Sequence, residues 1–264
     1  MAINIILAGP RGRMGSEAVQ MVLKEADFKL VACIDRKFDG QHLKDIDGMP
    51  DIDVPVFQDI EKCFQQVKAD IFIDLTVPEV GYYHTKKALE NKIRPVVGTT
   101  GFTDEQIIEL TELAKTNHTG CIIAPNFAIG AVLMMKFSQM AGKYFSDVEI
   151  IEKHHDKKLD APSGTAKKTA EMIMETREFK KQGHQDEKET IKGSRGGEMD
   201  GMRIHSVRLP GLVAHQEVIF GSSGQTLSIK HDSLNRDSFM EGIKLSVLKV
   251  MDMNELAYGL ENIL

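Results

Sequence analysis

The chain has 264 residues, and its 33 lysines and arginines against 39 aspartates and glutamates give a formal net charge of −6. This length fits one large domain or two ordinary ones. A mildly acidic balance argues against a nucleic-acid groove or an anionic membrane surface as the main partner. Hydrophobic residues make up 42% and charged residues 27%, which is typical of a soluble globular protein with a sizeable core and excludes disorder and collagen-like repeats.

Neither the apolar runs nor the cysteines indicate a membrane or secreted protein. No apolar run approaches the roughly 20 residues that a spanning helix needs. The apolar run Ile3–Ala8 has no cationic region before it, so we expect no signal peptide. Cys33, Cys63 and Cys121 are far apart and surrounded by apolar residues, which fits neither a disulfide framework nor a metal site. We expect buried thiols, no bound metal and a location in the reducing cytoplasm.

In the first 127 residues, short apolar runs alternate with segments of helical periodicity. Apolar residues lie at helical spacing over 18–23 and again over 107–114. Alternation of strands and helices predicts an α/β fold, a Rossmann-like parallel sheet with helices on both faces. The expected strands, rich in Ile and Val and bounded by Gly, Pro or Asp, are Ala2–Ala8, Leu30–Asp35, Ala69–Thr76, Arg94–Val97 and Gly120–Ala124.

The pattern changes after about residue 128 and predicts an α+β domain on a mostly open mixed sheet. Helical periodicity covers Ile129–Tyr144 and about Ser163–Arg177, and a strand pattern lies between them at Val148–Lys153. Three further runs alternate as antiparallel meander strands do: Met202–Leu209, Val213–Phe220 and Gln225–His231. A last helix, about Arg236–Val250, completes the first domain. We therefore expect a dinucleotide-binding domain at 1–127 and 237–264, and a substrate and oligomerisation domain at 128–236.

A polar run separates the second expected helix of this domain from the strands that follow. Arg177–Gly201 holds 12 charged residues among 25, and its larger apolar residues are only Phe179, Ile191 and Met199. Such a segment buries too little apolar surface to offset the entropy of ordering. We expect a mobile loop that closes as a lid when ligands bind.

A glycine-rich turn follows the first expected strand: Gly9-Pro10-Arg11-Gly12-Arg13-Met14-Gly15. Without Cβ atoms such a turn lets a pyrophosphate approach the backbone, and the helix that follows supplies free N–H groups. The spacing is G-x-x-G-x-x-G rather than the usual G-x-G-x-x-G, so a purely structural turn stays an alternative. Asp35 ends the second strand 20 residues after Gly15, where an acid binds the ribose hydroxyls. Together these features predict a nicotinamide dinucleotide.

The residues after Asp35 bear on the choice of dinucleotide. Arg36 and Lys37 offer cations to an adenosine 2′-phosphate, so a carboxylate beside cations indicates use of NADH and NADPH; the alternative is a pair of solvated loop charges. Two more loops should lie at the carboxyl edge of the parallel sheet and flank the nicotinamide. They are Gly98-Thr99-Thr100-Gly101 and Ala124-Pro125-Asn126-Phe127.

The densest group of chemically active residues lies at 152–166. Between Lys153 and Lys168 there are five lysines against two aspartates, and His154 and His155 stand beside them. Pro162-Ser163-Gly164-Thr165 is typical of a helix start, whose N–H groups suit a carboxylate. A histidine there can exchange a proton near neutral pH. The segment therefore predicts a site for an anionic substrate, the alternative being a solvated basic turn.

These motifs, in this order along nearly the whole chain, resemble those of the dihydrodipicolinate reductase family of the diaminopimelate and lysine pathway. The resemblance rests on the glycine turn, the two loops and the long run Glu152-x-His154-His155-x-x-Lys158-x-Asp160-Ala161-Pro162-Ser163-Gly164-Thr165-Ala166. The sequence has Asp35 where a longer acid is frequent in the family, which leaves the preference between NADH and NADPH open.

The resemblance implies an NAD(P)H-dependent reduction of 4-hydroxy-tetrahydrodipicolinate to tetrahydrodipicolinate, with hydride transfer to ring C4. It implies that His154 is the general acid or base and Lys158 a second proton donor. It implies that a second group holds the substrate carboxylates: His155, Ser163, Gly164, Thr165 and, less directly, Arg236. Family members are usually homotetramers joined through the sheet of the second domain.

Two other hypotheses fit parts of the sequence. A dinucleotide-sensing regulatory protein would share the fold but would not need His154 beside Lys158. A metal-dependent hydrolase would use His154, His155, Asp156 and Asp160 as ligands, but adjacent histidines on a strand point to opposite faces and do not easily serve one ion.

Overall fold

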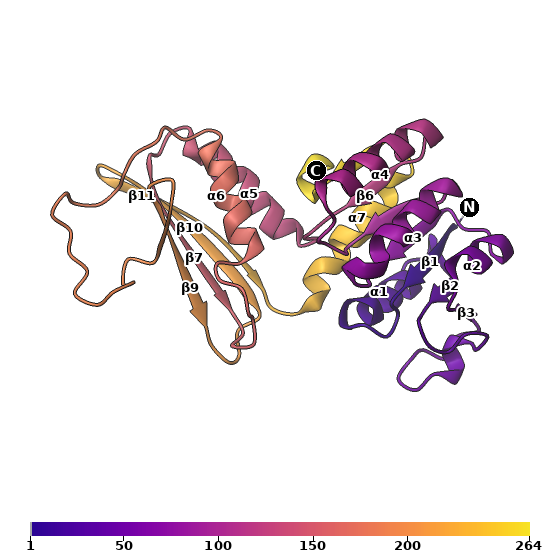
Figure 1. Cartoon of the computed structure of the whole chain (residues 1–264). Coiled ribbons are helices and arrows are strands. Elements are labelled where there is room, and N and C mark those ends of the chain that lie inside the picture. The colour runs from indigo at the N-terminus through magenta and orange to yellow at the C-terminus, as the bar shows by residue number, and fades with distance from the viewer. Residues whose placement is uncertain (1) are drawn as a thin grey trace. The chain divides into compact units, whose positions relative to one another are not determined.

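The computed structural model describes residues 2–264 and forms two compact units (Figure 1). Unit 1 consists of the chain up to Phe127 together with Phe239–Leu264, and unit 2 is Ala128–Ser238. The chain therefore leaves unit 1, builds unit 2 and returns. Among the described residues, no helix is long and apolar enough to cross a membrane.

Unit 1 is built on a seven-stranded sheet in the order β12-β6-β5-β4-β1-β2-β3, and all of its pairings are parallel. The strand order changes direction beside β1, which pairs with β2 on one side and with β4 on the other. Ligands of such sheets bind at the carboxyl edge beside this switch point. The strands are β1 (Ile3–Ala8), β2 (Phe28–Ile34), β3 (Val56–Phe57), β4 (Ile71–Asp74), β5 (Arg94–Val97), β6 (Cys121–Ile123) and β12 (Leu256–Tyr258).

Two of the α-helices of unit 1 begin at a capping side chain. Asp59 accepts the N–H groups of Glu61 and Lys62 to start α2, and Thr103 forms a capping box with Gln106 to start α4. The helices are α1 (Arg13–Lys24), α2 (Ile60–Gln66), α3 (Pro78–Glu90), α4 (Asp104–Asn117) and α7 (Met240–Val250), with short 3₁₀ turns at Leu43–Asp45 and Leu260–Asn262. A third 3₁₀ turn, Arg236–Phe239, lies where the chain returns from unit 2. The parallel α/β architecture expected from the sequence is confirmed; β3, β12, α2 and α3 were not expected.

Two buried apolar clusters hold the helices against the sheet of unit 1. One includes Phe72 and Cys63, and the other includes Leu110 and Cys121. All three cysteines, Cys33 among them, are buried and free. Burial raises the pKa of Cys63 to about 12 and that of Cys121 further, so these thiols act as small apolar side chains. The expectation of buried thiols is confirmed.

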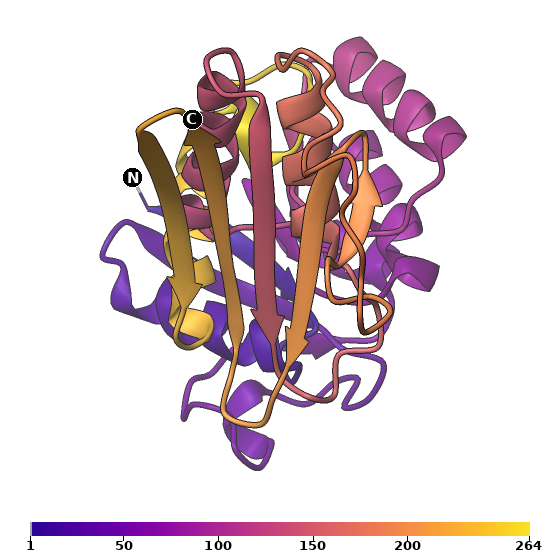
Figure 2. The same ribbon diagram turned by 90° about the vertical axis from the view of Figure 1, so that its left-hand side faces the viewer.

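Unit 2 is a five-stranded sheet in the order β11-β10-β7-β9-β8, with two helices against one face (Figure 2). Along β7 and β10 alternate side chains are buried, as expected for a sheet covered on one side. The helices α5 and α6 pack against each other and contact the sheet. The elements are α5 (Ile129–Gly142), β7 (Asp147–His154), α6 (Gly164–Met174), β8 (Gly197–Met199), β9 (Met202–Arg208), β10 (Ala214–Ser222) and β11 (Gln225–Ser233).

The predicted antiparallel meander is wrong for β9. Of the three expected strands only β10 and β11 form a hairpin. β9 pairs in parallel with β7, which lies between β9 and β10, and antiparallel with the short strand β8. The earlier strand β7 has the alternating pattern of a half-buried strand and takes the central place. The strands that follow it then pair along its two edges. Alternation identifies a strand but does not identify its partner.

The polar run at 177–201 is tied to unit 2 at both ends. The buried guanidinium of Arg177 donates to the carbonyl oxygens of Ser146, Lys180 and Asp200 at 2.6–2.9 Å. The run also contributes β8, which pairs with β9. Charge-assisted hydrogen bonds therefore supply order that apolar burial does not. The mobility of the rest of the run and its closure on ligand binding stay predictions.

Candidate functional site

The glycine turn of unit 1 forms an anion-binding cradle. Gly9 has φ +81°, in the region that glycine adopts without strain. A Cβ on Gly15 would lie against the carbonyl of Gly9, 2.7 Å from its carbonyl carbon, so α1 approaches the turn as closely as only glycine allows. The N-cap residue Gly12 has no side chain to accept an N–H of the first turn of α1, and that turn contains no acid. The N–H groups of Arg13 and Met14 therefore suit a phosphate.

Asp35 follows β2 at the same edge and is held by a cation. Arg11 donates from Nε and from its terminal nitrogen to the two carboxylate oxygens at 2.9 and 2.8 Å, and the backbone N–H of Lys37 donates at 2.9 Å. The Arg11 guanidinium also lies 4.8 Å from the ring centroid of Phe38. The side chain of Arg36 is exposed. The predicted ribose acid is thus in place, and Arg11 is the cation that contacts it.

A buried carboxylate that the sequence analysis did not single out connects the next two loops. Asp74 ends β4 with 0% exposure, and its oxygens accept from the N–H and hydroxyl of Thr76 at 2.9 and 2.6 Å, from the Thr99 hydroxyl at 2.8 Å and from Nδ1 of His84 at 2.8 Å. Burial raises the pKa of Asp74, but hydrogen bonds from His84 and Thr76 outweigh it and hold that pKa below its usual value. Asp74 therefore fixes the loops after β4 and β5 and, through His84, the middle of α3.

The two loops expected to flank the nicotinamide lie side by side. A Cβ on Gly98 would meet the Phe127 ring at 3.0 Å and the Leu75 side chain at 2.7 Å. Phe127 is buried, and its carbonyl lies so close to α7 that a Cβ on Gly242 would stand 2.8 Å from the carbonyl carbon. The segments after β1, β4, β5 and β6 thus gather along one edge of the sheet. Together with the glycine cradle, their geometry fits a bound dinucleotide.

In unit 2, β7 ends at His154, whose side chain is 15% exposed. Its Nδ1 lies 2.5 Å from a carboxylate oxygen of Glu152. In the loop that follows, Nζ of Lys158 donates to Asp160 at 2.7 Å, and this hydrogen bond lowers the pKa of Asp160. His155 is exposed beside them. The loop therefore presents an oriented imidazole and an ammonium group on one short segment.

The start of α6 is a second cradle for an anion. The buried hydroxyl of Ser163 accepts the N–H of Ala166 at 3.2 Å, so the hydroxyl predicted to bind substrate acts here as the helix cap. Gly164 and Thr165 form the first turn, which contains no acid, and a Cβ on Gly164 would meet nothing within 4 Å. A helix N-terminus with open space beside it attracts a carboxylate.

Two residues tie this segment together, and sequence reasoning gave neither a role. Glu152 is fully buried, and it accepts from both terminal nitrogens of Arg208 at 2.7 and 2.8 Å. Arg208 also donates to the carbonyl of Asp160 at 2.8 Å. The spacing of Glu152 and His154 was the available signal, because residues i and i+2 of a strand share a face. Arg236 is exposed in its 3₁₀ turn, and within residues 2–264 no hydrogen bond joins it to the 154–165 segment.

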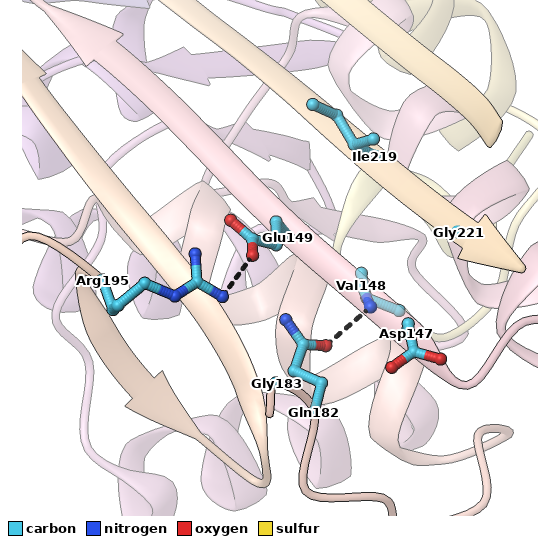
Figure 3. A pocket seen from close by; sticks show the side chains of 8 residues that line it. All are labelled: Asp147, Val148, Glu149, Gln182, Gly183, Arg195, Ile219 and Gly221. Carbon is cyan, nitrogen blue, oxygen red and sulfur yellow. Dashed lines mark hydrogen bonds and ion pairs between the residues drawn. The ribbon is translucent and has the colours of Figure 1, made fainter. Parts of the chain in front are cut away.

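A hollow of about 320 Å³ lies elsewhere in unit 2, at the start of β7 (Figure 3). Its lining includes Gln182, whose side-chain oxygen accepts the N–H of Val148 at 2.8 Å, and Arg195, which donates to Glu149 at 2.8 Å. His154 stands at the far end of this strand, seven residues or roughly 20 Å away at the rise of a β-strand. The hollow is therefore distinct from the 154–165 segment and marks where the polar run is anchored.

These features define a class of protein. A parallel sheet with a glycine cradle at its switch point, in one chain with an α+β unit that carries a histidine and a basic helix start, is the construction of a nicotinamide-dependent oxidoreductase. The protein is an oxidoreductase that takes NADH or NADPH.

The chain belongs to the dihydrodipicolinate reductase family. Family models for the N-terminus and the C-terminus of dihydrodipicolinate reductase match residues 3–127 and 130–264. The chain is 69% identical over 265 residues to a 4-hydroxy-tetrahydrodipicolinate reductase of Oceanobacillus iheyensis and 64% identical over 264 residues to one of Geobacillus thermodenitrificans, each covering 100% of both chains. The family inferred from the motifs is confirmed.

Solved structures agree with this assignment. The dipicolinate-bound dihydrodipicolinate reductase from Paenisporosarcina sp. TG-14 matches with a TM-score of 0.93 and 55% identity over 100% of both chains. An amine dehydrogenase from Mycobacterium smegmatis matches with a TM-score of 0.66 over 97% of this chain and 95% of that one, at 12% identity, and so shares the fold alone.

Proposed function

We propose that the protein reduces 4-hydroxy-tetrahydrodipicolinate to tetrahydrodipicolinate with NADH or NADPH, in the diaminopimelate and lysine pathway. The observation that carries the proposal is the 154–165 segment, in which an oriented histidine, a lysine and an open helix start follow one another. Full-length similarity to reductases of this substrate supports it. A dipicolinate-bound relative supports a small anionic ring as the ligand.

In this proposal unit 1 holds the dinucleotide. The pyrophosphate lies on the α1 start at Gly9-Pro10-Arg11-Gly12-Arg13-Met14, the adenosine ribose lies near Asp35 and Arg36, and the nicotinamide lies against Gly98-Thr99-Thr100 and Ala124-Pro125-Asn126-Phe127. The bound cofactor supplies a hydride. The network of Asp74 keeps the loops after β4 and β5 in one arrangement, so the cofactor site needs little reorganisation on binding.

The 154–165 segment holds the substrate. A dianionic ring needs cations and free N–H donors, and the start of α6 at Gly164 and Thr165, with His155, provides both for one carboxylate. We assign Arg236 to the second carboxylate. Ser163 contributes through its cap, which sets where the first turn of the helix points.

The residues of the loop move the protons. Hydride addition at C4 of the ring, after loss of water from the substrate, leaves negative charge on the neighbouring carbon, which must gain a proton. His154 gives or takes that proton through Nε2, because its Nδ1 faces Glu152. Lys158 is the second donor, and Asp160 holds its ammonium group in the same loop.

An absorbance assay of NADH and NADPH oxidation tests this function, with the condensation product of pyruvate and aspartate semialdehyde as substrate. The wild-type protein should oxidise at least one cofactor only when that substrate is present. A His154→Gln, Lys158→Ala double variant should bind dinucleotide as tightly as the wild type and turn over at least 100-fold more slowly. Full turnover by the double variant would refute the mechanism, and no wild-type turnover with either cofactor would refute the function.

We also propose a cytoplasmic homotetramer joined through the five-stranded sheet. On the face of this sheet opposite α5 and α6, Ile151 of β7 lies across from Glu217 and Ile219 of β10 lies across from Glu149, and both isoleucines are only half-buried. A second copy would cover them. Sedimentation velocity of the purified protein measures the assembly: a monomer at micromolar concentration would refute it.

A further inference from the structure

One carboxylate in unit 2 accepts four hydrogen bonds. Glu152 lies on β7 with 0% exposure. One oxygen accepts from Nδ1 of His154 at 2.5 Å and from Arg208 at 2.8 Å. The other accepts from Arg208 at 2.7 Å and from the N–H of Ser163 at 3.2 Å. A buried carboxylate with this many donors stays ionised and immobile.

Resting on the function proposed above, we propose that Glu152, held by Arg208, is a positioning residue that fixes the tautomer and orientation of His154. A carboxylate only accepts hydrogen bonds, so Nδ1 of His154 must carry the proton that points to it. The nitrogen left for proton exchange with the substrate is then Nε2. In this tautomer Nε2 can take up a second proton and donate it to the substrate as an imidazolium that Glu152 stabilises. A neutral histidine that carried its proton on Nε2 instead could donate it only by becoming an imidazolate anion beside the carboxylate.

Strand geometry makes this arrangement rigid. Glu152 and His154 are two residues apart on β7 and so share one face of the sheet. Arg208 is the direct pairing partner of His154 on the neighbouring strand β9. Its guanidinium donates one hydrogen bond to each oxygen of Glu152, which fixes the rotation of the carboxylate and favours its ionised form.

The same carboxylate connects the other parts of the substrate segment. Ser163, the cap of α6, donates its N–H to Glu152, and Arg208 donates to the carbonyl of Asp160, the residue that holds Lys158. Burial raises the pKa of Glu152, but hydrogen bonds from His154 and Arg208 outweigh it and hold the pKa at about 2. The connection therefore persists throughout the neutral pH range.

Glu152→Gln separates this role from a purely structural one. An amide in place of the carboxylate must turn one N–H donor toward existing donors. If the amide NH₂ pointed toward Ser163, it would face the backbone N–H of Ser163 and an N–H of Arg208, and neither of these can become an acceptor. If it pointed toward His154, it would face one N–H of Arg208 and an imidazole that can become an acceptor by moving its proton from Nδ1 to Nε2. The variant should therefore invert the His154 tautomer and lower kcat by about 100-fold or more, with the Kd for NADH unchanged.

The matched control is Glu149→Gln on the same strand. Glu149 also pairs with an arginine and a histidine, Arg195 and His205, both at 2.8 Å. It lies three residues before Glu152, on the other face of the sheet. This variant loses the same kind of interactions without facing His154, so its kcat should stay within about 3-fold of the wild type.

Nitrogen-15 NMR of the His154 ring, recorded where the imidazole is neutral, reads the tautomer without using activity. In a His154→Gln background, Glu152→Gln should change the residual rate by less than about 3-fold, because the residue acts through the histidine. An unchanged tautomer in Glu152→Gln, or an equal loss of rate in both backgrounds, would overturn the positioning role. Such results would leave the proposed function standing as long as the wild type turns over.

Glu152→Asp provides the test if Glu152→Gln does not fold. It keeps the negative charge but withdraws the carboxylate by one methylene, which breaks the 2.5 Å contact with His154. We expect kcat to fall at least 10-fold while the Kd for NADH is unchanged. Wild-type kcat in this variant would overturn the proposal, because charge without contact would then suffice.

Discussion

Gly15→Ala should damage the protein through a single methyl group. Gly15 is buried in the first turn of α1. Its added Cβ would stand 2.7 Å from the carbonyl carbon of Gly9 and 3.2 Å from Cα of Pro10, with the Gly9 oxygen closer still. Relaxed carbon–carbon contacts lie at about 3.5–4.0 Å. Because the obstacle is backbone, α1 must move away from the turn by about 1 Å.

The sign of the effect follows from two opposing terms. Alanine favours the helix over glycine by about 1 kcal/mol, whereas overpacking costs about 1–3 kcal/mol or more. A backbone obstacle puts Gly15 at the upper end of that range, so we expect a net loss of about 2 kcal/mol in the free energy of unfolding. For a protein of this size, that loss lowers Tm by about 4–8 °C.

The displacement also opens the cradle for the pyrophosphate. A hydrogen bond to a charged group is worth about 1.5–3 kcal/mol, so loss of one N–H contact raises the Kd for NADH at least about 10-fold. Differential scanning calorimetry and NADH fluorescence titration measure the two effects. Gly164→Ala is the control, because its Cβ meets nothing within 4 Å, and it should change neither Tm nor the Kd for NADH. A Gly15→Ala protein as stable as the wild type would refute the argument.

Three further predictions follow from buried or paired charges. Asp74→Asn should lower the free energy of unfolding by about 3 kcal/mol at pH 7. Because folding lowers the pKa of Asp74 from 3.8, the ionised carboxylate stabilises the fold above pH 3.8 and loses this effect as the pH falls below it. The difference in Tm between the variant and the wild type should therefore shrink below pH 3.8. Arg11→Ala removes the cation beside Asp35 and should shift the ratio of kcat/KM at least 5-fold toward NADH in a two-cofactor assay; an unchanged ratio would show that Arg11 does not affect the choice between the two cofactors. Arg195→Ala releases the polar run from Glu149; thermolysin should cut the run several-fold faster while Tm falls by less than about 2 °C, and unchanged cleavage would show that the anchor lies elsewhere.

The parts of the fold that the sequence predicted are those with strong local patterns. β5 was expected at its observed bounds because the short apolar run Pro95–Val97 is bounded by Arg94 and Gly98. β3 has two residues and β12 three, too few for any periodicity, and they exist because neighbouring strands offer free edges. The place of β9 beside β7 could not be inferred for a related reason: pairing depends on which edges remain open in space, and alternation records only which side chains are buried.

The site residues likewise fall into those that a local sequence pattern identifies and those that only tertiary structure identifies. Glycine-rich loops that bind phosphate through their backbone can be identified from the spacing of their glycines. Glu152 and Asp74 are single carboxylates in otherwise apolar strands, and a single charge in such a strand does not indicate a role. Their meaning comes from partners far away in the chain: Arg208 is 56 residues from Glu152, and Thr99 is 25 from Asp74. Each of the two carboxylates lies at or near the end of a strand and is fully buried. Each accepts a hydrogen bond from Nδ1 of a histidine and further hydrogen bonds from the segments that follow the strand. The two units thus use the same device, a desolvated carboxylate that holds functional loops in place. Two of the negative charges counted in the sequence therefore belong to the interior, and only tertiary structure distinguishes them from the charges on the surface.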